Sequence, residues 1–231
     1  MPEMKSLSNI WDRTWDLYTK NFKSTSVLVL IFSVPLIILY LFAPYSMFKP
    51  DLLNGRWIFF TADILLGALI GMVLSLSLNY NIYQSSKNHK VKFIDALRFA
   101  LSKFWTAFGT SLLMALMLIG LFLLLIVPGI IFAIYWSFLI PVIIIKNLSG
   151  KKALDYSKSV VRKRWWKTLG YSIVLELIPV AIIMTVMLLM TAYYPSNIGY
   201  SIYYIISLLA SIFIYTSQIV LFLELDRTKV K

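Results

Sequence analysis

The feature that most constrains this chain is a set of long runs without any charged residue. One such run covers 42 consecutive residues, from Phe104 to Ile145. One helix needs about 20 apolar residues to cross the hydrocarbon core of a bilayer, so this run has the length of two crossings. Soluble domains are about 25% charged, whereas this chain is 14% charged and 60% hydrophobic. We therefore expect an integral membrane protein.

The uncharged runs predict six membrane spans. Asp63 and Glu176 are the only charged residues inside the runs, and the Pro128-Gly129 pair is expected to form a tight hairpin turn. Backbone groups in hydrocarbon must pair within their own segment, and the runs lack the alternation of a transmembrane barrel. The expected fold class is therefore an all-α bundle of six transmembrane helices. The spans lie at 27–43, at 57–86, twice within 104–145 and twice within 168–223.

The basic residues are distributed unevenly around these spans. With six spans, 20 of the 22 Lys and Arg residues fall on one side, and only Lys49 and Arg56 fall on the other. Basic residues are enriched in cytoplasmic loops. We therefore expect both termini, and the loops 87–103 and 146–167, to lie in the cytoplasm of a cell-membrane protein. This topology accounts for the net charge of +12 without a nucleic-acid partner.

Three of the predicted cytoplasmic segments share one spacing. In each, an apolar residue precedes an Asp, a Lys follows eight positions after the Asp, and an aromatic residue follows ten positions after it. The segments begin at Trp11-Asp12, Ile94-Asp95 and Leu154-Asp155. Their helical periodicity predicts three amphipathic interfacial helices, each leading into a pair of spans. The pattern suggests repeat units 7–86, 91–146 and 150–225 within a single membrane domain, 1–231.

One cytoplasmic loop holds the densest group of basic and aromatic residues. Basic and aromatic side chains at this position are typical of membrane anchoring. They also suit recruitment of anionic lipid headgroups, at about 1 kcal/mol for each basic residue near a negative surface. Both interpretations make membrane lipids, and anionic lipids in particular, the expected partner. The cluster consists of Arg162, Lys163, Arg164, Trp165, Trp166 and Lys167.

A few polar or small residues lie within the predicted spans. Asp63 and Glu176 are ionisable, and together with Gln218 they could line a polar seam. Such a seam suits a transporter or channel, whereas the alternative interpretation is hydrogen-bonded packing between neighbouring helices. In the second span, small residues recur every four positions, which is typical of close helix packing. These residues are Gly67, Gly71 and Ser75.

The sequence shows no arrangement of residues typical of an enzyme. With 0 Cys and 1 His, one chain cannot build a disulfide, a thiolate zinc site or a multi-histidine metal site. No Gly-rich phosphate loop precedes a helix, and no His is placed beside a nucleophile. We therefore expect no enzymatic activity, no metal and no cofactor.

Several motifs in the middle of the chain resemble a known group of membrane proteins. They are Pro128-Gly129-Ile130-Ile131, Trp136-Ser137, Asn147-Leu148-Ser149 and Arg164-Trp165-Trp166-Lys167, within residues 90–180. The segment resembles uncharacterised multi-pass proteins of bacteria and archaea, which are similar to the membrane domain attached to some glycerophosphodiester phosphodiesterases. The resemblance implies an all-helical membrane domain of unsettled role. Its hydrolytic activity does not carry over, because the chain has no room for the metal-binding phosphodiesterase domain.

Two functions from different classes follow from these observations. The first is a non-enzymatic multi-pass membrane protein that organises lipids or partner proteins through its basic cytoplasmic helices. The alternative is a small transporter or channel that uses the intramembrane polar seam.

Overall fold

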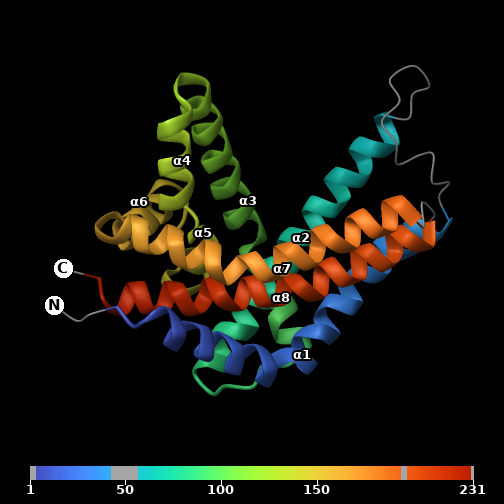
Figure 1. Cartoon of the computed structure of the whole chain (residues 1–231), viewed down its shortest axis with the longest axis horizontal. Coiled ribbons are helices and arrows are strands. Elements are labelled where there is room, and N and C mark those ends of the chain that lie inside the picture. The colour runs from blue at the N-terminus through green and yellow to red at the C-terminus, as the bar shows by residue number, and fades with distance from the viewer. Residues whose placement is uncertain (1–3, 43–56, 194–196, 230–231) are drawn as a thin grey trace.

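The computed structural model describes residues 4–42, 57–193 and 197–229, which form helices joined by short turns, with no strand among them (Figure 1). The all-α fold class predicted from the apolar runs is therefore confirmed. In chain order the helices are α1 (Leu7–Phe42), α2 (Trp57–Ser86), α3 (Phe93–Leu124), α4 (Ile126–Tyr135), α5 (Leu139–Lys146), α6 (Gly150–Val161), the short 3₁₀ helix η2 (Arg162–Arg164), α7 (Trp165–Tyr193) and α8 (Asn197–Arg227).

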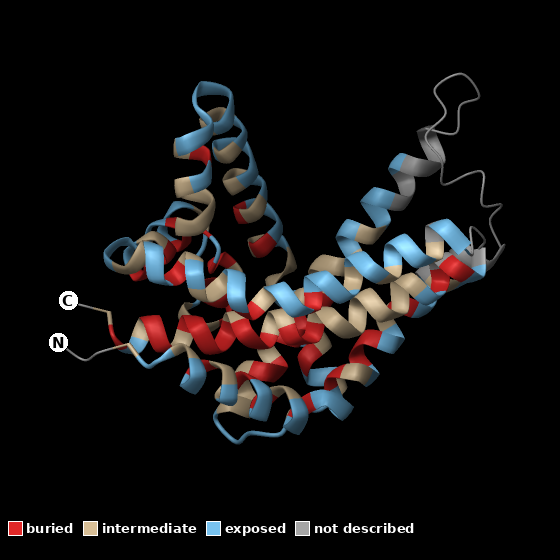
Figure 2. Cartoon of the chain, in the orientation of Figure 1, coloured by how far each residue is buried: buried red, intermediate tan, exposed pale blue. Residues whose placement is uncertain are grey.

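Five helical segments of the described chain are long and apolar enough to cross a membrane. Many of their large apolar side chains are exposed, up to 82% at Leu123, and such a surface is stable against lipid rather than water (Figure 2). The chain is therefore a multi-pass membrane protein. α1 is not one of the five segments, so the count of six spans stays a prediction. The five are Ile64–Ser86, Phe93–Leu124, Ile126–Lys146, Gly150–Met190 and Ser201–Arg227.

α8 packs against more than half of the other helices, most extensively against α1 and α7. α1 runs along one side of it and α7 along another, and α2 also contacts it (Figure 1). The consecutive residues 219–222 of α8 are all buried, as expected for a helix surrounded by neighbours. Nearer the middle of α8, the ring of Phe213 packs against Trp11, Trp15 and Tyr18 of α1, with ring centroids 5.5, 6.4 and 5.5 Å away.

The hairpin between α3 and α4 turns three residues before the predicted Pro128-Gly129 pair. The break lies at Leu125, which has extended backbone angles, and Pro128 and Gly129 belong to the first turns of α4. Proline is compatible with the first turn of a helix because the amide there has no intrahelical acceptor. Gly129 is needed for packing instead, since a Cβ at this position would lie 2.5 Å from the ring of Phe122 on α3.

The return arm of this hairpin is not one continuous helix. α4 ends at Tyr135, residues 136–138 form a turn, and α5 begins at Leu139. α5 then ends at Asn147, whose left-handed backbone (φ 54°) stops the helix. α6 starts directly after Ser149, the N-cap residue, whose side chain makes no capping hydrogen bond.

Two of the three segments predicted as amphipathic interfacial helices are continuous with the long helices that follow them, and their interfacial position stays a prediction. Residues 11–22 and 94–105 are the first turns of the long helices α1 and α3, since no breaking residue separates them from the apolar segments that follow. Only α6 is a separate short helix, and it packs its apolar residues Leu154 and Val161 into the protein core rather than presenting them to lipid. The threefold repeat is not confirmed.

Candidate functional site

The predicted basic cluster lies where α6 meets α7, and the structure divides it into two groups. Arg162, Lys163, Trp166 and Lys167 are exposed, with 78% of Trp166 accessible. The 3₁₀ helix η2 breaks the register between α6 and α7, which turns these side chains outward. The exposed group is called the basic junction below: Arg162, Lys163, Trp166 and Lys167.

The other two members of the cluster face inward. The indole Nε1–H of Trp165 donates to the carbonyl of Ile131 on α4 at 3.2 Å, and the Arg164 guanidinium donates to the Thr228 hydroxyl beyond α8. Both side chains are half-buried. They attach α7 to the rest of the bundle, so they are structural residues. Sequence spacing alone did not separate them from their exposed neighbours.

A small cavity of about 180 Å³ opens beside the basic junction. Four of the residues that line it are basic, namely Arg162, Lys163, Arg164 and Lys229. None of its lining residues is acidic. The contribution of Lys229 was not predicted, because it follows from the packing of the chain's C-terminal residues against α6, which no local pattern indicates.

The acidic residues at the end of α8 are already engaged by other groups. Asp226 pairs with Lys146 Nζ at 2.7 Å and accepts a hydrogen bond from the Tyr156 hydroxyl at 2.6 Å. Glu224 is 1% exposed, and it accepts hydrogen bonds from the Arg227 guanidinium at 2.6 Å and from the backbone N–H of Lys5 at 3.0 Å. These carboxylates are therefore held by partners outside the basic junction.

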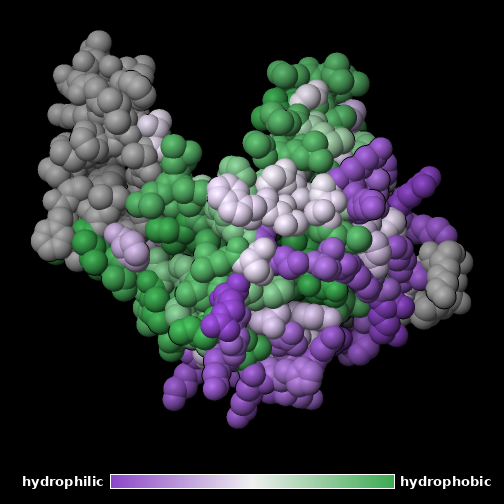
Figure 3. Space-filling model, turned by 180° about the vertical axis from the view of Figure 1, so that it is seen from behind, coloured by the Kyte–Doolittle hydropathy of each residue, from purple (hydrophilic) through white to green (hydrophobic). Residues whose placement is uncertain are grey.

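The positive charge of the basic junction is consequently not neutralised within the described chain. Among the described residues, no carboxylate forms an ion pair with Arg162, Lys163 or Lys167. Figure 3 shows that hydrophilic residues gather at one end of the molecule, next to the hydrophobic surface of the helices. An exposed cationic group at such a boundary can bind an anion that lies at the membrane surface.

The structure places two of the three residues of the predicted polar seam next to each other. Glu176 on α7 and Gln218 on α8 are half-buried, and their side chains lie close enough to interact. The side chain of Asp63 lies outside the described residues, so its place relative to this pair stays a prediction. The Glu176–Gln218 contact agrees with both interpretations of the seam. A carboxyl inside the membrane needs a polar neighbour whether it serves helix packing or transport.

The close packing predicted at Gly67 and Gly71 stays a prediction. A Cβ added at either glycine would meet no described atom within 4 Å, because this part of α2 extends away from the other described helices (Figure 1). Ser75, one turn further along α2, does lie at a helix contact. It is a hydrogen-bond partner of Tyr215 on α8, and its carbonyl accepts a bond from the Asn79 amide at 2.8 Å.

The structure offers no metal site in the part of the chain it describes. No group of three His, Cys, Asp or Glu residues there is placed to hold a metal ion.

Comparison with known proteins gives no family for the chain. It matches no family model, no curated protein and no solved structure. The resemblance to membrane domains of glycerophosphodiester phosphodiesterases therefore stays a prediction from the sequence motifs.

The two adjacent tryptophans should respond differently to the same substitution. Trp165→Phe removes the hydrogen bond to Ile131 and leaves a carbonyl without its partner, so it should lower the free energy of unfolding by about 1 kcal/mol. Trp166→Phe should change it by less than about 0.5 kcal/mol, because that side chain is exposed. Thermal unfolding of both variants in the same detergent measures the difference. An equal decrease in the free energy of unfolding for both variants would contradict the structural role of Trp165.

Proposed function

We propose that this protein is a non-enzymatic, six-span membrane protein that binds anionic lipids through the basic junction at the cytoplasmic face of the cell membrane. The observation that supports this most directly is the exposure of Arg162, Lys163, Trp166 and Lys167 where a polar helix meets an apolar one. No acidic residue of the described chain pairs with these cations. They are therefore available to lipid headgroups or to an acidic partner protein.

The location of the junction suits lipid binding on physical grounds. Each basic residue near an anionic leaflet contributes about 1 kcal/mol of attraction, and the interaction decays over about 10 Å at 0.1 M salt. Trp166 lies between Lys167 and the 3₁₀ turn, and tryptophan is favoured at the level of the headgroups. Together these residues would concentrate anionic lipids around the protein. The protein would organise membrane lipids in this way.

Lipid retention tests this function directly. The variant Arg162→Gln/Lys163→Gln/Lys167→Gln leaves the Arg164–Thr228 contact in place. It should bind phosphatidylglycerol at least about tenfold more weakly, because three headgroup attractions are lost. Native mass spectrometry of the purified protein, titrated with phosphatidylglycerol and phosphatidylcholine, measures the change.

A matched variant controls for the loss of net charge. Arg98→Gln/Lys151→Gln/Lys152→Gln removes three exposed basic residues elsewhere on the same side. It should retain phosphatidylglycerol as the wild type does. Equal retention by the wild type and both variants would leave the junction with an anchoring role only.

The proposed topology has its own test. The chain contains 0 Cys, so single cysteines introduced at Ser46, Ser149 and Asn197 report one site each. With both termini in the cytoplasm, a membrane-impermeant thiol reagent should label positions 46 and 197 in intact cells, but not position 149. Labelling of position 149 from outside would overturn the six-span arrangement.

A small transporter or channel is the second candidate function, and the contact between Glu176 and Gln218 favours it. A carboxyl within apolar helices is costly and is often functional. If Glu176 carries a proton or a cation, Glu176→Gln should abolish flux in proteoliposomes, while the thermal stability stays near that of the wild type because Gln keeps the hydrogen-bonding capacity. The absence of flux in the wild type under proton and cation gradients would exclude this candidate under those conditions.

A further inference from the structure

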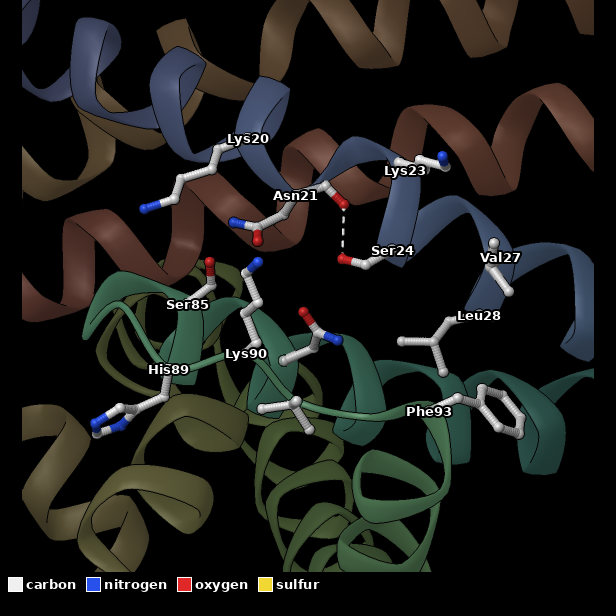
Figure 4. A pocket seen from close by; sticks show the side chains of 12 residues that line it. Lys20, Asn21, Lys23, Ser24, Val27, Leu28, Ser85, His89, Lys90 and Phe93 are labelled. Atoms are coloured by element: carbon white, nitrogen blue, oxygen red, sulfur yellow. Dashed lines mark hydrogen bonds between the residues drawn. The ribbon is translucent and has the colours of Figure 1, made fainter.

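A second basic cavity lies between α1, α2 and the loop that joins α2 to α3 (Figure 4). Its volume is about 540 Å³, which falls in the range of small-molecule sites, about 300–1,000 Å³. Its lining includes Lys20, Lys23, His89 and Lys90. No residue of the lining is acidic. It shares no residue with the basic junction.

The loop that forms one wall of this cavity has a defined conformation. It turns at Asn88, whose backbone is left-handed (φ 62°). The N–H of His89 donates to the carbonyl of Gln84 at 3.0 Å, and the N–H of Asn88 donates to that of Ser85 at 2.9 Å. These two bonds make a Schellman motif at the end of α2. Lys20 Nζ donates to Asn88 Oδ1 at 2.8 Å and so ties the loop to α1.

Polar groups from three segments converge inside the cavity. In Figure 4 the ammonium group of Lys90, the amide of Asn21 and the hydroxyl of Ser85 point toward one another, whereas Lys23 and His89 point away. Within the described chain, Lys90 has no carboxylate partner. A cation beside hydrogen-bonding groups and without an acidic neighbour is an arrangement suited to an oxyanion.

One further polar side chain of this cavity makes no hydrogen bond to the described protein. Asn81 on α2 lines the cavity and is only 5% exposed, yet its amide makes no hydrogen bond to any described residue. Its neighbours differ: Asn79 donates to the Ser75 carbonyl and Asn21 donates to the Leu17 carbonyl, each at 2.8 Å. The polar atoms of the Asn81 amide are not fully enclosed by protein, so its N–H groups can donate to a ligand that enters the cavity.

The opposite end of the cavity is apolar. Val27, Leu28 and Phe93 lie together there, away from Lys20 and Ser85 (Figure 4). Leu28 is buried, while Val27 is 47% exposed and begins the apolar part of α1. The cavity therefore changes from cationic to apolar in the direction in which α1 enters its uncharged segment. A free phosphate would contact only the cationic end.

We propose that this cavity is a binding site for one molecule of an anionic membrane lipid, which it recognises by a phosphate group carried on an acyl chain. Lys20 and Lys90 pair with the phosphate, and the Asn81 amide donates a hydrogen bond to it. The apolar end contacts the first carbons of the acyl chain. The site is independent of the basic junction, and it gives the protein a specific lipid position in addition to a surface that attracts lipids.

The test uses the full chain in a neutral detergent, with dioctanoyl phosphatidic acid as the probe and isothermal titration calorimetry as the measurement. Lys20→Gln/Lys90→Gln should raise the Kd for this lipid by about tenfold or more, since two charge-assisted contacts are lost. Lys90→Gln alone leaves the Lys20–Asn88 bond intact and should raise the Kd as well. Lys151→Gln/Lys152→Gln, which removes the same charge from α6, should leave the Kd unchanged.

Asn81→Leu separates ligand binding from folding. The Asn81 amide makes no hydrogen bond to the described residues, so replacing it by an apolar side chain of similar size removes no internal bond and should not lower the melting temperature. It should still raise the Kd for phosphatidic acid several-fold, because the amide no longer donates to the phosphate. An unchanged Kd in both Asn81→Leu and Lys20→Gln/Lys90→Gln would overturn the site.

Two comparisons distinguish the ligand source and the two lipid sites. Inorganic phosphate should bind far more weakly than phosphatidic acid, and binding of equal strength would show a site for soluble phosphate and overturn the lipid assignment. The variant Arg162→Gln/Lys163→Gln/Lys167→Gln should keep the wild-type Kd for a single phosphatidic acid. Weaker binding of phosphatidic acid by this variant would place the lipid at the basic junction instead of this cavity.

Discussion

The polar ends of several helices are joined by two carboxylates in the last turns of α8, the buried Glu224 and the partly buried Asp226. A buried charge is costly unless it is paired and hydrogen-bonded. Glu224 meets this condition through Arg227 and the backbone of Lys5, and Asp226 meets it through Lys146 and Tyr156. These bonds join the N-terminal segment, the end of α5 and α6 to α8. The helix that is surrounded by the others is thus also the one that connects their polar ends.

This pairing determines which positive charges remain available. Because Glu224 and Asp226 are occupied by other groups, neither compensates the cations of the basic junction or of the cavity between α1 and α2. Both cationic regions lie next to apolar surface, on α7 in one case and on α1 in the other. The combination favours amphiphilic ligands with an anionic group over soluble anions. It provides a common physical basis for the two lipid-binding proposals.

Much of the fold could be predicted from local patterns, and the errors have identifiable causes. The uncharged runs indicated the helices, but periodicity could not show that residues 11–22 and 94–105 continue into the helices that follow. The Pro128-Gly129 pair indicated a turn, yet proline is equally suited to the first turn of α4, and the reversal occurs at Leu125. For the site, the cluster 162–167 was found from charge density alone. The inward orientation of Trp165 depends on Ile131 of a different helix, which sequence spacing does not reveal.

The sequence by itself determined the membrane character, the helical class and the segregation of basic residues, because hydropathy and charge are properties of each segment alone. Only the tertiary structure decided which polar residues meet. Glu176 faces Gln218, Lys20 bonds to Asn88, and Asn81 lines a cavity without a hydrogen bond to any described residue. These relations join residues that are far apart in the chain or depend on how closely neighbouring helices pack. No local pattern contains that information, because the distance between two helices is set by all the side chains between them.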